Sequence, residues 1–230
     1  MKQYFIIGGS AGIGQAVVKQ LSQANHSVIT TYNHSEVEEL ENVTYHQYDV
    51  LDKDKSLPEV PEVLDGVVYC PGRIQLKPFH RLSAEDFTQD YELQVLGAIE
   101  AIQHALPSLK KAENPSIVLF STVAVQTGFM FHSTVAASKG AIEGLTRALA
   151  AEFAPKIRVN AIAPSITQTN LSQRLLNSEE KIQSNAARHP LNKIGHPSDI
   201  ASLATFLLSD QSSWMTGQII HLDGGLSTLK

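Results

Sequence analysis

The sequence predicts an α/β fold in which a parallel sheet of about seven strands carries helices on both faces. Short β-branched runs alternate with longer amphipathic stretches along all 230 residues, which is the pattern of repeated strand–helix units. Most of the short runs are apolar at successive positions, as expected for strands that are buried on both faces. The predicted strands are residues 4–7, 27–31, 43–48, 67–70, 117–120, 158–162 and 218–222.

Helical patterns separate most of these strands. Four helices are expected at Gln15–Ala24, Phe87–Leu109, Ala136–Phe153 and Ser198–Leu208, with a further short one near Ser178–Ala187. Residues 32–42 are polar and leave room for a short helix at most. We therefore expect one domain over residues 1–230, with ligands bound beyond the carboxyl ends of the strands.

The composition excludes several classes of function. The 18 basic and 23 acidic residues give a net charge of −5 without a basic tract, which argues against nucleic-acid and membrane surfaces. Cys70 is the single cysteine, so an internal disulfide is ruled out, and no cysteine or histidine spacing suggests a metal. The N-terminus shows no signal peptide and no apolar stretch is long enough for a bilayer, so we expect a cytoplasmic protein with a small-molecule substrate.

The most informative local feature is an apolar strand followed at once by a glycine-rich turn, at residues 4–14. Gly8, Gly12 and Gly14 let the backbone turn tightly and approach a pyrophosphate, and Ser10 and Ile13 belong to the same turn. The N–H groups at the start of the following helix would face the phosphates. The alternative is a turn whose glycines serve only the packing of a strand against a helix.

Further motifs follow the turn in a fixed order. They are Tyr-Asp-Val at 48–50, Pro-Gly at 71–72, Arg-Val-Asn-Ala-Ile-Ala-Pro at 158–164 and Met-Thr-Gly-Gln-Ile-Ile-His-Leu-Asp-Gly-Gly at 215–225. With the glycine turn, they make the chain resemble the short-chain dehydrogenase/reductase family over essentially its whole length. The resemblance implies a Rossmann-like doubly wound sheet and an NAD(P)-dependent oxidoreductase that transfers hydride between nicotinamide and a small carbonyl or alcohol. It also implies a homodimer or homotetramer that pairs the two long helices.

The resemblance assigns cofactor contacts to individual positions. Asp49, followed by Val50, matches the carboxylate that binds the adenine amino group, although a solvated loop aspartate is the alternative. Of the family's Asn-Asn-Ala-Gly turn, this chain retains only the glycine, at Gly72. The remaining matches are Pro164, the backbone of Ile166 and Thr169 at the nicotinamide carboxamide, and Lys139 at the ribose hydroxyls.

The end of the second strand bears on the choice between NAD and NADP. No carboxylate stands where it would exclude a 2′-phosphate, and no arginine stands ready to pair with one. The side chains that can hydrogen-bond a phosphate are Thr31, Asn33, His34 and Ser35, whereas Glu36, Glu38 and Glu39 oppose it. The balance favours NADP slightly.

The catalytic segment departs from the family pattern. The family uses a tyrosine as acid or base and a lysine four residues later; here Lys139 is in place, but Val135 occupies the tyrosine position. Thr122 stands at the position of the family serine, with Ser121 as second choice, and Gln94 stands at that of the asparagine. The site therefore keeps a hydroxyl, an ammonium and an amide but lacks its usual acid.

Two residues are candidates to replace the tyrosine. Histidine is the commonest general acid or base, and His132 lies just before the helix, although it can equally pack at a subunit contact or cap the helix. Lys139 can act through a water, because a lysine near a cationic nicotinamide can have a lowered pKa. Ser165 stands where the family has glycine, and residues 167–189 fall at the family's substrate lid.

Three functions follow from these residues. The first is an NAD(P)-dependent oxidoreductase with a non-standard acid or base. The second is an inactive dinucleotide-binding protein, serving as a sensor or partner subunit. In the third, the chemistry needs no general acid because the substrate takes its proton from water. The retained polar set favours the enzyme.

Overall fold

Seven parallel strands form one sheet in the computed structural model, which describes residues 1–52 and 54–229. The strands are β1 (Gln3–Ile7), β2 (Ser27–Tyr32), β3 (Val43–Gln47), β4 (Gly66–Tyr69), β5 (Ser116–Phe120), β6 (Arg158–Pro164) and β7 (Ile219–Leu222). All seven predicted strands are confirmed, with ends that differ by one or two residues. Their order across the sheet is β3-β2-β1-β4-β5-β6-β7, so the winding direction reverses between β1 and β4 and opens a crevice there.

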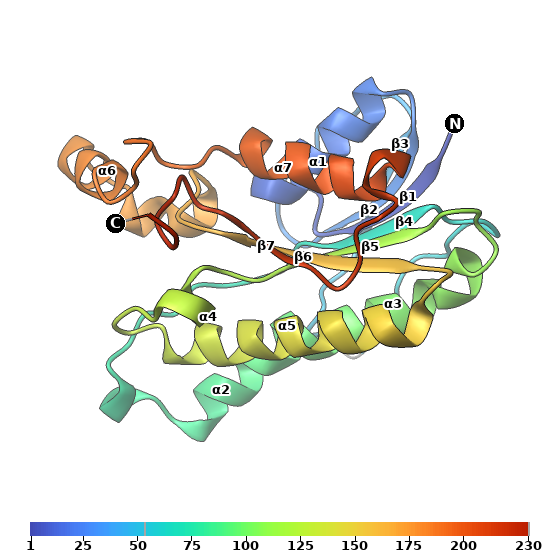
Figure 1. The fold of residues 1–230 in the computed structure, drawn as a ribbon. Coiled ribbons are helices and arrows are strands. Elements are labelled where there is room, and N and C mark those ends of the chain that lie inside the picture. The colour runs from blue at the N-terminus through green and yellow to red at the C-terminus, as the bar shows by residue number, and fades with distance from the viewer. Residues whose placement is uncertain (53, 230) are drawn as a thin grey trace.

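Helices cover both faces of this sheet (Figure 1). On one face lie α1 (Gly12–Gln23) and α7 (Pro197–Leu208), and on the other α2 (Ala84–Tyr91), α3 (Gly97–Leu109) and α5 (Ser133–Phe153). The short helices α4 (Ala124–Thr127) and α6 (Glu179–Ala186) lie beyond the strand ends, and short 3-10 helices occupy Phe79–Arg81, Asn170–Leu175 and Asp210–Ser212. The doubly wound α/β prediction is confirmed. None of the helices in the described part of the chain combines the length and apolar composition that crossing a bilayer demands.

Successive side chains of each central strand enter two separate hydrophobic cores, because side chains alternate across a strand. Phe5 and Ile7 of β1 pack with α3 and α5, whereas Tyr4 and Ile6 pack with α1 and α7. All four side chains are 2% exposed or less. Burying an apolar side chain of this size stabilises the fold by about 1.5–3 kcal/mol. These two cores hold the strand ends, and hence the site, in place.

The helix predicted at Phe87–Leu109 is not continuous. It consists of α2, a π-helical segment at Glu92–Leu96 and α3. The hydroxyl of Tyr69 donates a hydrogen bond to the carbonyl of Leu93 in this segment. Tyr69 can approach because Gly97 has no side chain: a Cβ there would lie 2.3 Å from the tyrosine oxygen. Hydrophobic periodicity does not reveal such a π turn, which often marks a functional position.

Two other boundaries differ from the prediction. α1 and α5 each begin three residues earlier than expected, at Gly12 and Ser133, although glycine and β-branched residues have low helix propensity. Val135 and Lys139 therefore lie one turn apart on the same side of α5. The polar stretch at residues 33–42 contains no helix.

Candidate active site

The turn between β1 and α1 requires glycine at more than one position. Gly8 has a φ of +79°, and a Cβ on Gly14 would lie 2.1 Å from the carbonyl oxygen of Gly8. The hydroxyl of Thr31, at the end of β2, accepts a hydrogen bond of 2.9 Å from the Gly8 N–H and fixes the turn. No side chain caps the N-terminus of α1. Its first N–H groups therefore remain available to an anionic group beside the turn.

A cavity of about 460 Å³ lies beside this turn. It brings together most of the residues predicted to bind the cofactor: Gly8, Ser10, Gly12, Ile13, Gly14, Thr31, Asn33, Asp49, Val50, Gly72 and Thr169. One carboxylate oxygen of Asp49 accepts a hydrogen bond of 3.0 Å from the Leu51 N–H, which orients the side chain. Among the described residues that line this cavity, Asp49 is the only charged one. The glycine turn leaves no room for side chains, and the N-terminus of α1 lies beside it. These two features fit a dinucleotide.

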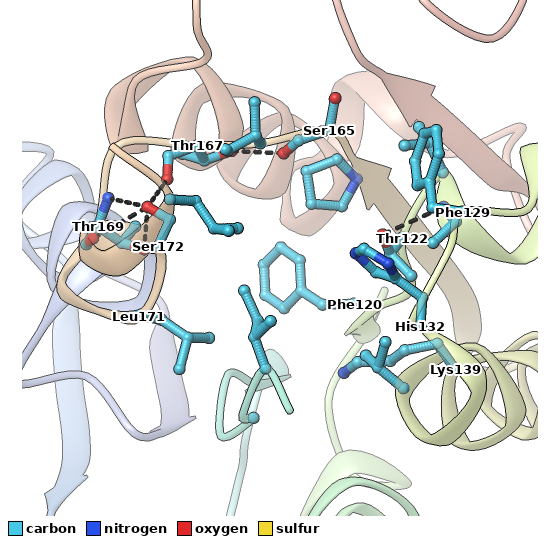
Figure 2. Close-up of a pocket in the computed structure, with 18 of the residues that line it drawn as sticks. Phe120, Thr122, Phe129, His132, Lys139, Ser165, Thr167, Thr169, Leu171 and Ser172 are labelled. Atoms are coloured by element: carbon cyan, nitrogen blue, oxygen red, sulfur yellow. Dashed lines mark hydrogen bonds between the residues drawn. The ribbon is translucent and has the colours of Figure 1, made fainter. Parts of the chain in front are cut away.

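A second cavity, of about 510 Å³, adjoins the first (Figure 2). Five residues line both cavities: Ile13, Cys70, Gly72, Thr169 and Leu171. The larger cavity lies at the ends of β4, β5 and β6 and against the first turns of α5. The four predicted catalytic residues, Thr122, His132, Lys139 and Gln94, all line it. The structure thus places the predicted polar set next to the predicted cofactor cradle.

Ser121 and Thr122, the two hydroxyls after β5, differ in their partners. Ser121 is 4% exposed and donates a hydrogen bond of 2.8 Å to the buried carboxylate of Glu143. The hydroxyl of Thr122 accepts a longer hydrogen bond of 3.3 Å from the Ala124 N–H at the cavity wall (Figure 2). Thr122 is therefore the hydroxyl in a position to meet a ligand, in line with its first rank in the prediction.

Val135 and Lys139 are both buried in the wall of the larger cavity. Burial lowers the pKa of Lys139 to about 8, against the opposing negative charge of Asp90 and the nearby Cys70 thiol. An amine with this pKa changes its protonation state near neutral pH and can serve as acid or base. Val135, one turn before it, has no proton to exchange.

His132 extends from the start of α5 into the same cavity (Figure 2). Its Nδ1 lies 2.8 Å from the carbonyl oxygen of Met130. Because a carbonyl only accepts, Nδ1 carries the proton and Nε2 is the free nitrogen. The ring packs edge-on against Phe129 at 5.5 Å between centroids. His132 occupies the N-cap position of α5, but its side chain makes no capping hydrogen bond.

The segment after β6 lies directly over the glycine turn. A Cβ on Gly12 would lie 3.2 Å from the Cγ2 atom of Thr169. Pro164, Ile166 and Thr169, the residues predicted to hold the nicotinamide, all line the larger cavity. The carbonyl of Ile166 accepts a hydrogen bond of 3.2 Å from the Gly195 N–H, which ties the segment to the chain that follows α6.

A buried Ser165–His189 pair was not predicted from the sequence. His189 is 3% exposed. Its Nε2 lies 2.8 Å from the Ser165 hydroxyl, and its Nδ1 lies 2.8 Å from the carbonyl oxygen of Asn185. Both ring nitrogens are thus satisfied inside the protein. The sequence signal for this pair is Ser165, which stands where the family has glycine and whose hydroxyl is the hydrogen-bond partner of His189.

A second missed feature is a buried ion pair beside Gln94. Asp90 is 0% exposed, and one of its oxygens lies 3.2 Å from Nε of Arg73. Its other oxygen accepts a hydrogen bond of 2.6 Å from the Gln94 amide nitrogen. The four-residue spacing of Asp90 and Gln94 places them on one helix face. The spacing does not reveal that this face is buried together with the charged Asp90 side chain.

Comparisons with known proteins agree with this geometry. A family model described as enoyl-(acyl carrier protein) reductase matches residues 8–227. The 3-oxoacyl-(acyl-carrier-protein) reductase FabG of Thermotoga maritima is 32% identical, over 98% of this chain and 97% of its own length. A short-chain dehydrogenase family protein of Francisella tularensis superposes with a TM-score of 0.88 at 30% identity, over 99% of both chains. ElxO, solved with NADP bound, superposes with a TM-score of 0.85 at 27% identity, over 98% of both chains.

The family match covers nearly the whole chain, and the sheet order, the glycine cradle and the adjoining polar cavity agree with it. The chain belongs to the short-chain dehydrogenase/reductase family of NAD(P)-dependent oxidoreductases.

Proposed function

We propose that this chain interconverts a small ketone and its alcohol with NAD(P), and that Lys139 replaces the missing tyrosine as the proton donor and acceptor. The observation that carries the proposal is the buried amine of Lys139, with its pKa lowered to about 8, in a cavity where Val135 takes the place of the usual acid. The hydroxyl of Thr122 lies in the same cavity and can orient the substrate oxygen.

When bound, a nicotinamide cofactor would supply the hydride in reduction and accept it in oxidation. During reduction, the carbonyl oxygen gains a proton from the Lys139 ammonium, which becomes a neutral amine and is reprotonated from solvent. Thr122 donates a hydrogen bond to that oxygen and so stabilises its developing negative charge. During oxidation, the neutral amine of Lys139 accepts the alcohol proton.

The residues around the smaller cavity support a cofactor with a 2′-phosphate. Thr31, Asn33 and Ser35 line it near the end of β2, and no glutamate does. Apart from Asp49, which is assigned to the adenine amino group, no carboxylate lies among the described lining residues. We expect NADPH to raise the melting temperature more than NADH does at equal concentration, by mass action. A larger shift with NADH would overturn the NADP preference.

The walls of the larger cavity support an apolar substrate body. Its apolar lining residues include Ile74, Leu76, Phe120, Phe129, Leu171 and Leu175. A ketone attached to an aliphatic or aromatic group would bury its apolar surface there and place its oxygen near Thr122. A panel of aliphatic and aromatic ketones is therefore the first screen, read as oxidation of NADPH.

The pH dependence of kcat/KM tests the role of Lys139 against that of His132. A lysine acid must be protonated for reduction, so the rate should fall as pH rises through about 8. His132→Ala should leave this fall in place. A fall with pH that disappears in His132→Ala would assign the acid to His132 instead.

A dinucleotide-binding protein without hydride transfer is the second candidate. The observation that favours it is Val135, which cannot exchange a proton. Such a protein would gain thermal stability with the cofactor but oxidise none of it across the ketone panel.

A further inference from the structure

We propose that Glu143 is a positioning residue. Its buried carboxylate holds the segment that carries Thr122 against the helix that carries Lys139, and so fixes the hydroxyl and the amine relative to each other around the substrate oxygen. This inference rests on the proposed function, in which Thr122 and Lys139 act on that oxygen.

The carboxylate of Glu143 binds the segment after β5 at two points. Glu143 is 3% exposed and lines neither of the two cavities. Its Oε1 accepts a hydrogen bond of 2.8 Å from the Ser121 hydroxyl, and its Oε2 accepts one of 2.9 Å from the Gln126 amide nitrogen. The two donors lie on either side of Thr122 in the chain, so the carboxylate fixes both ends of the short segment between them.

Each of these hydrogen bonds acts on Thr122. Ser121 is its direct neighbour at the end of β5. Gln126 belongs to α4, and the first residue of this helix, Ala124, donates its N–H to the Thr122 hydroxyl at 3.3 Å. Because the hydroxyl oxygen accepts this hydrogen bond, its own hydrogen can be donated to a substrate oxygen in the cavity. The positions of Ser121 and α4 together therefore set the direction of the Thr122 hydroxyl.

Glu143 also connects this hydroxyl to the proposed proton donor. It lies one turn after Lys139 on α5, and Thr122 and Lys139 both line the larger cavity (Figure 2). The helix that supplies the amine thus also holds the segment that supplies the hydroxyl. Two groups that act on one oxygen lose most of their effect when one of them moves, because the reacting geometry is narrow.

The choice of a carboxylate at this position points to geometry rather than to stability. Arg147, one turn later on α5, pairs with Oε2 at 3.4 Å, and its side chain is 55% exposed. Such a long and solvated ion pair offsets little of the cost of burying the charge. An apolar side chain could fill the same space without that cost, but it could not accept hydrogen bonds from Ser121 and Gln126.

A double-mutant cycle tests the coupling between Glu143 and Thr122. Glu143→Leu removes both hydrogen bonds, and Thr122→Val removes the hydroxyl while it keeps the shape of the side chain. We expect Glu143→Leu alone to lower kcat for ketone reduction about 10- to 100-fold with an unchanged cofactor Kd. In the Thr122→Val background, the same substitution should lower kcat by less than about twofold. Equal losses in the two backgrounds would overturn the positioning role.

Two further variants of α5 separate hydrogen-bond geometry from charge. Glu143→Gln can accept from Gln126 and donate to the Ser121 hydroxyl, so it keeps both contacts and should retain most of the wild-type kcat. A loss as large as that of Glu143→Leu would overturn the proposal. Glu152→Leu, at an exposed position of the same helix, is the matched control and should leave kcat unchanged.

The setting of Thr122 can also be measured without turnover. The ¹³C signal of its methyl group, identified by its absence from Thr122→Val, reports this side chain in the cofactor-free protein. Gln126→Ala removes only the contact with α4, at an exposed residue, and covers the case in which Glu143→Leu fails to fold. We expect Gln126→Ala to shift the Thr122 signal and to lower kcat, and Thr127→Ser, at the next exposed residue, to do neither. An unshifted Thr122 signal in Gln126→Ala would contradict the proposal.

The outcomes separate the two proposals. If Lys139→Met keeps wild-type hydride transfer, the proposed function is wrong, and the methyl signal still shows whether Glu143 positions Thr122. If Lys139→Met is inactive but Glu143→Leu lowers kcat equally with and without the Thr122 hydroxyl, the positioning role of Glu143 is wrong while the proposed function survives.

Discussion

The hydroxyl of Ser165 and Nε2 of His189 are 2.8 Å apart, and this hydrogen bond joins the end of β6 to the chain just after α6. Nδ1 of His189 is already hydrogen-bonded to the Asn185 carbonyl, so Ser165 is the partner of the other ring nitrogen, Nε2. The bond fixes residues 167–189 over the larger cavity.

Removing this hydroxyl should destabilise the protein. We expect Ser165→Gly, which restores the residue usual in the family, to lower the free energy of unfolding by about 1–3 kcal/mol, because it leaves a buried ring nitrogen unpaired. Urea unfolding measures the change. Ser213→Ala, at an exposed serine, is the control and should stay within about 0.5 kcal/mol. Equal stability of Ser165→Gly and wild type would show that the bond contributes nothing.

The glycine turn gives a sharp prediction for cofactor binding. In Gly14→Ala the new methyl would lie 2.1 Å from the Gly8 carbonyl oxygen, so the turn must shift. We expect the thermal stabilisation by NADPH to disappear. Gly144→Ala is the control: a Cβ there meets nothing within 4 Å, and alanine in a helix interior is better than glycine by about 0.5–1 kcal/mol. NADPH binding by Gly14→Ala with wild-type affinity would refute the assignment of this turn.

Val135→Tyr tests whether the site can use the conventional acid. A tyrosine hydroxyl one turn before Lys139 would add a proton donor, so we expect kcat for ketone reduction to rise. Val135 is 6% exposed, and the added volume should cost about 1–3 kcal/mol of stability. Val135→Phe has the bulk without the hydroxyl and should show no gain. Lower activity of Val135→Tyr with intact cofactor binding would mean that valine shapes the pocket for another proton donor.

Much of the fold could be predicted from the sequence because it depends on local patterns. Most strands of the sheet are apolar at successive positions, so their number and type could be predicted. The glycine turn could also be predicted, because Gly8, Gly12 and Gly14 let the backbone turn tightly. The π-helical segment at Glu92–Leu96 was not predictable, because it depends on Tyr69 approaching Leu93 across the fold.

The candidate site was only partly predictable. The motif positions gave Thr122, Gln94 and Lys139, and His132 was added as a candidate acid; all four line one cavity. The pairs Ser165–His189 and Arg73–Asp90 were missed, because each joins segments that are distant in sequence, and burial of a histidine or an aspartate is set by tertiary packing.

The most direct test of the central claim follows a deuterium atom. Wild-type protein, incubated with NADPH that is deuterated at the nicotinamide C4 and with the ketone panel, should yield an alcohol that carries deuterium at the former carbonyl carbon, detected by mass spectrometry. Lys139→Met should yield none at the same cofactor saturation. Thermal stabilisation by NADPH without deuterium transfer from the wild-type protein to any ketone would contradict the account and leave a cofactor-binding protein.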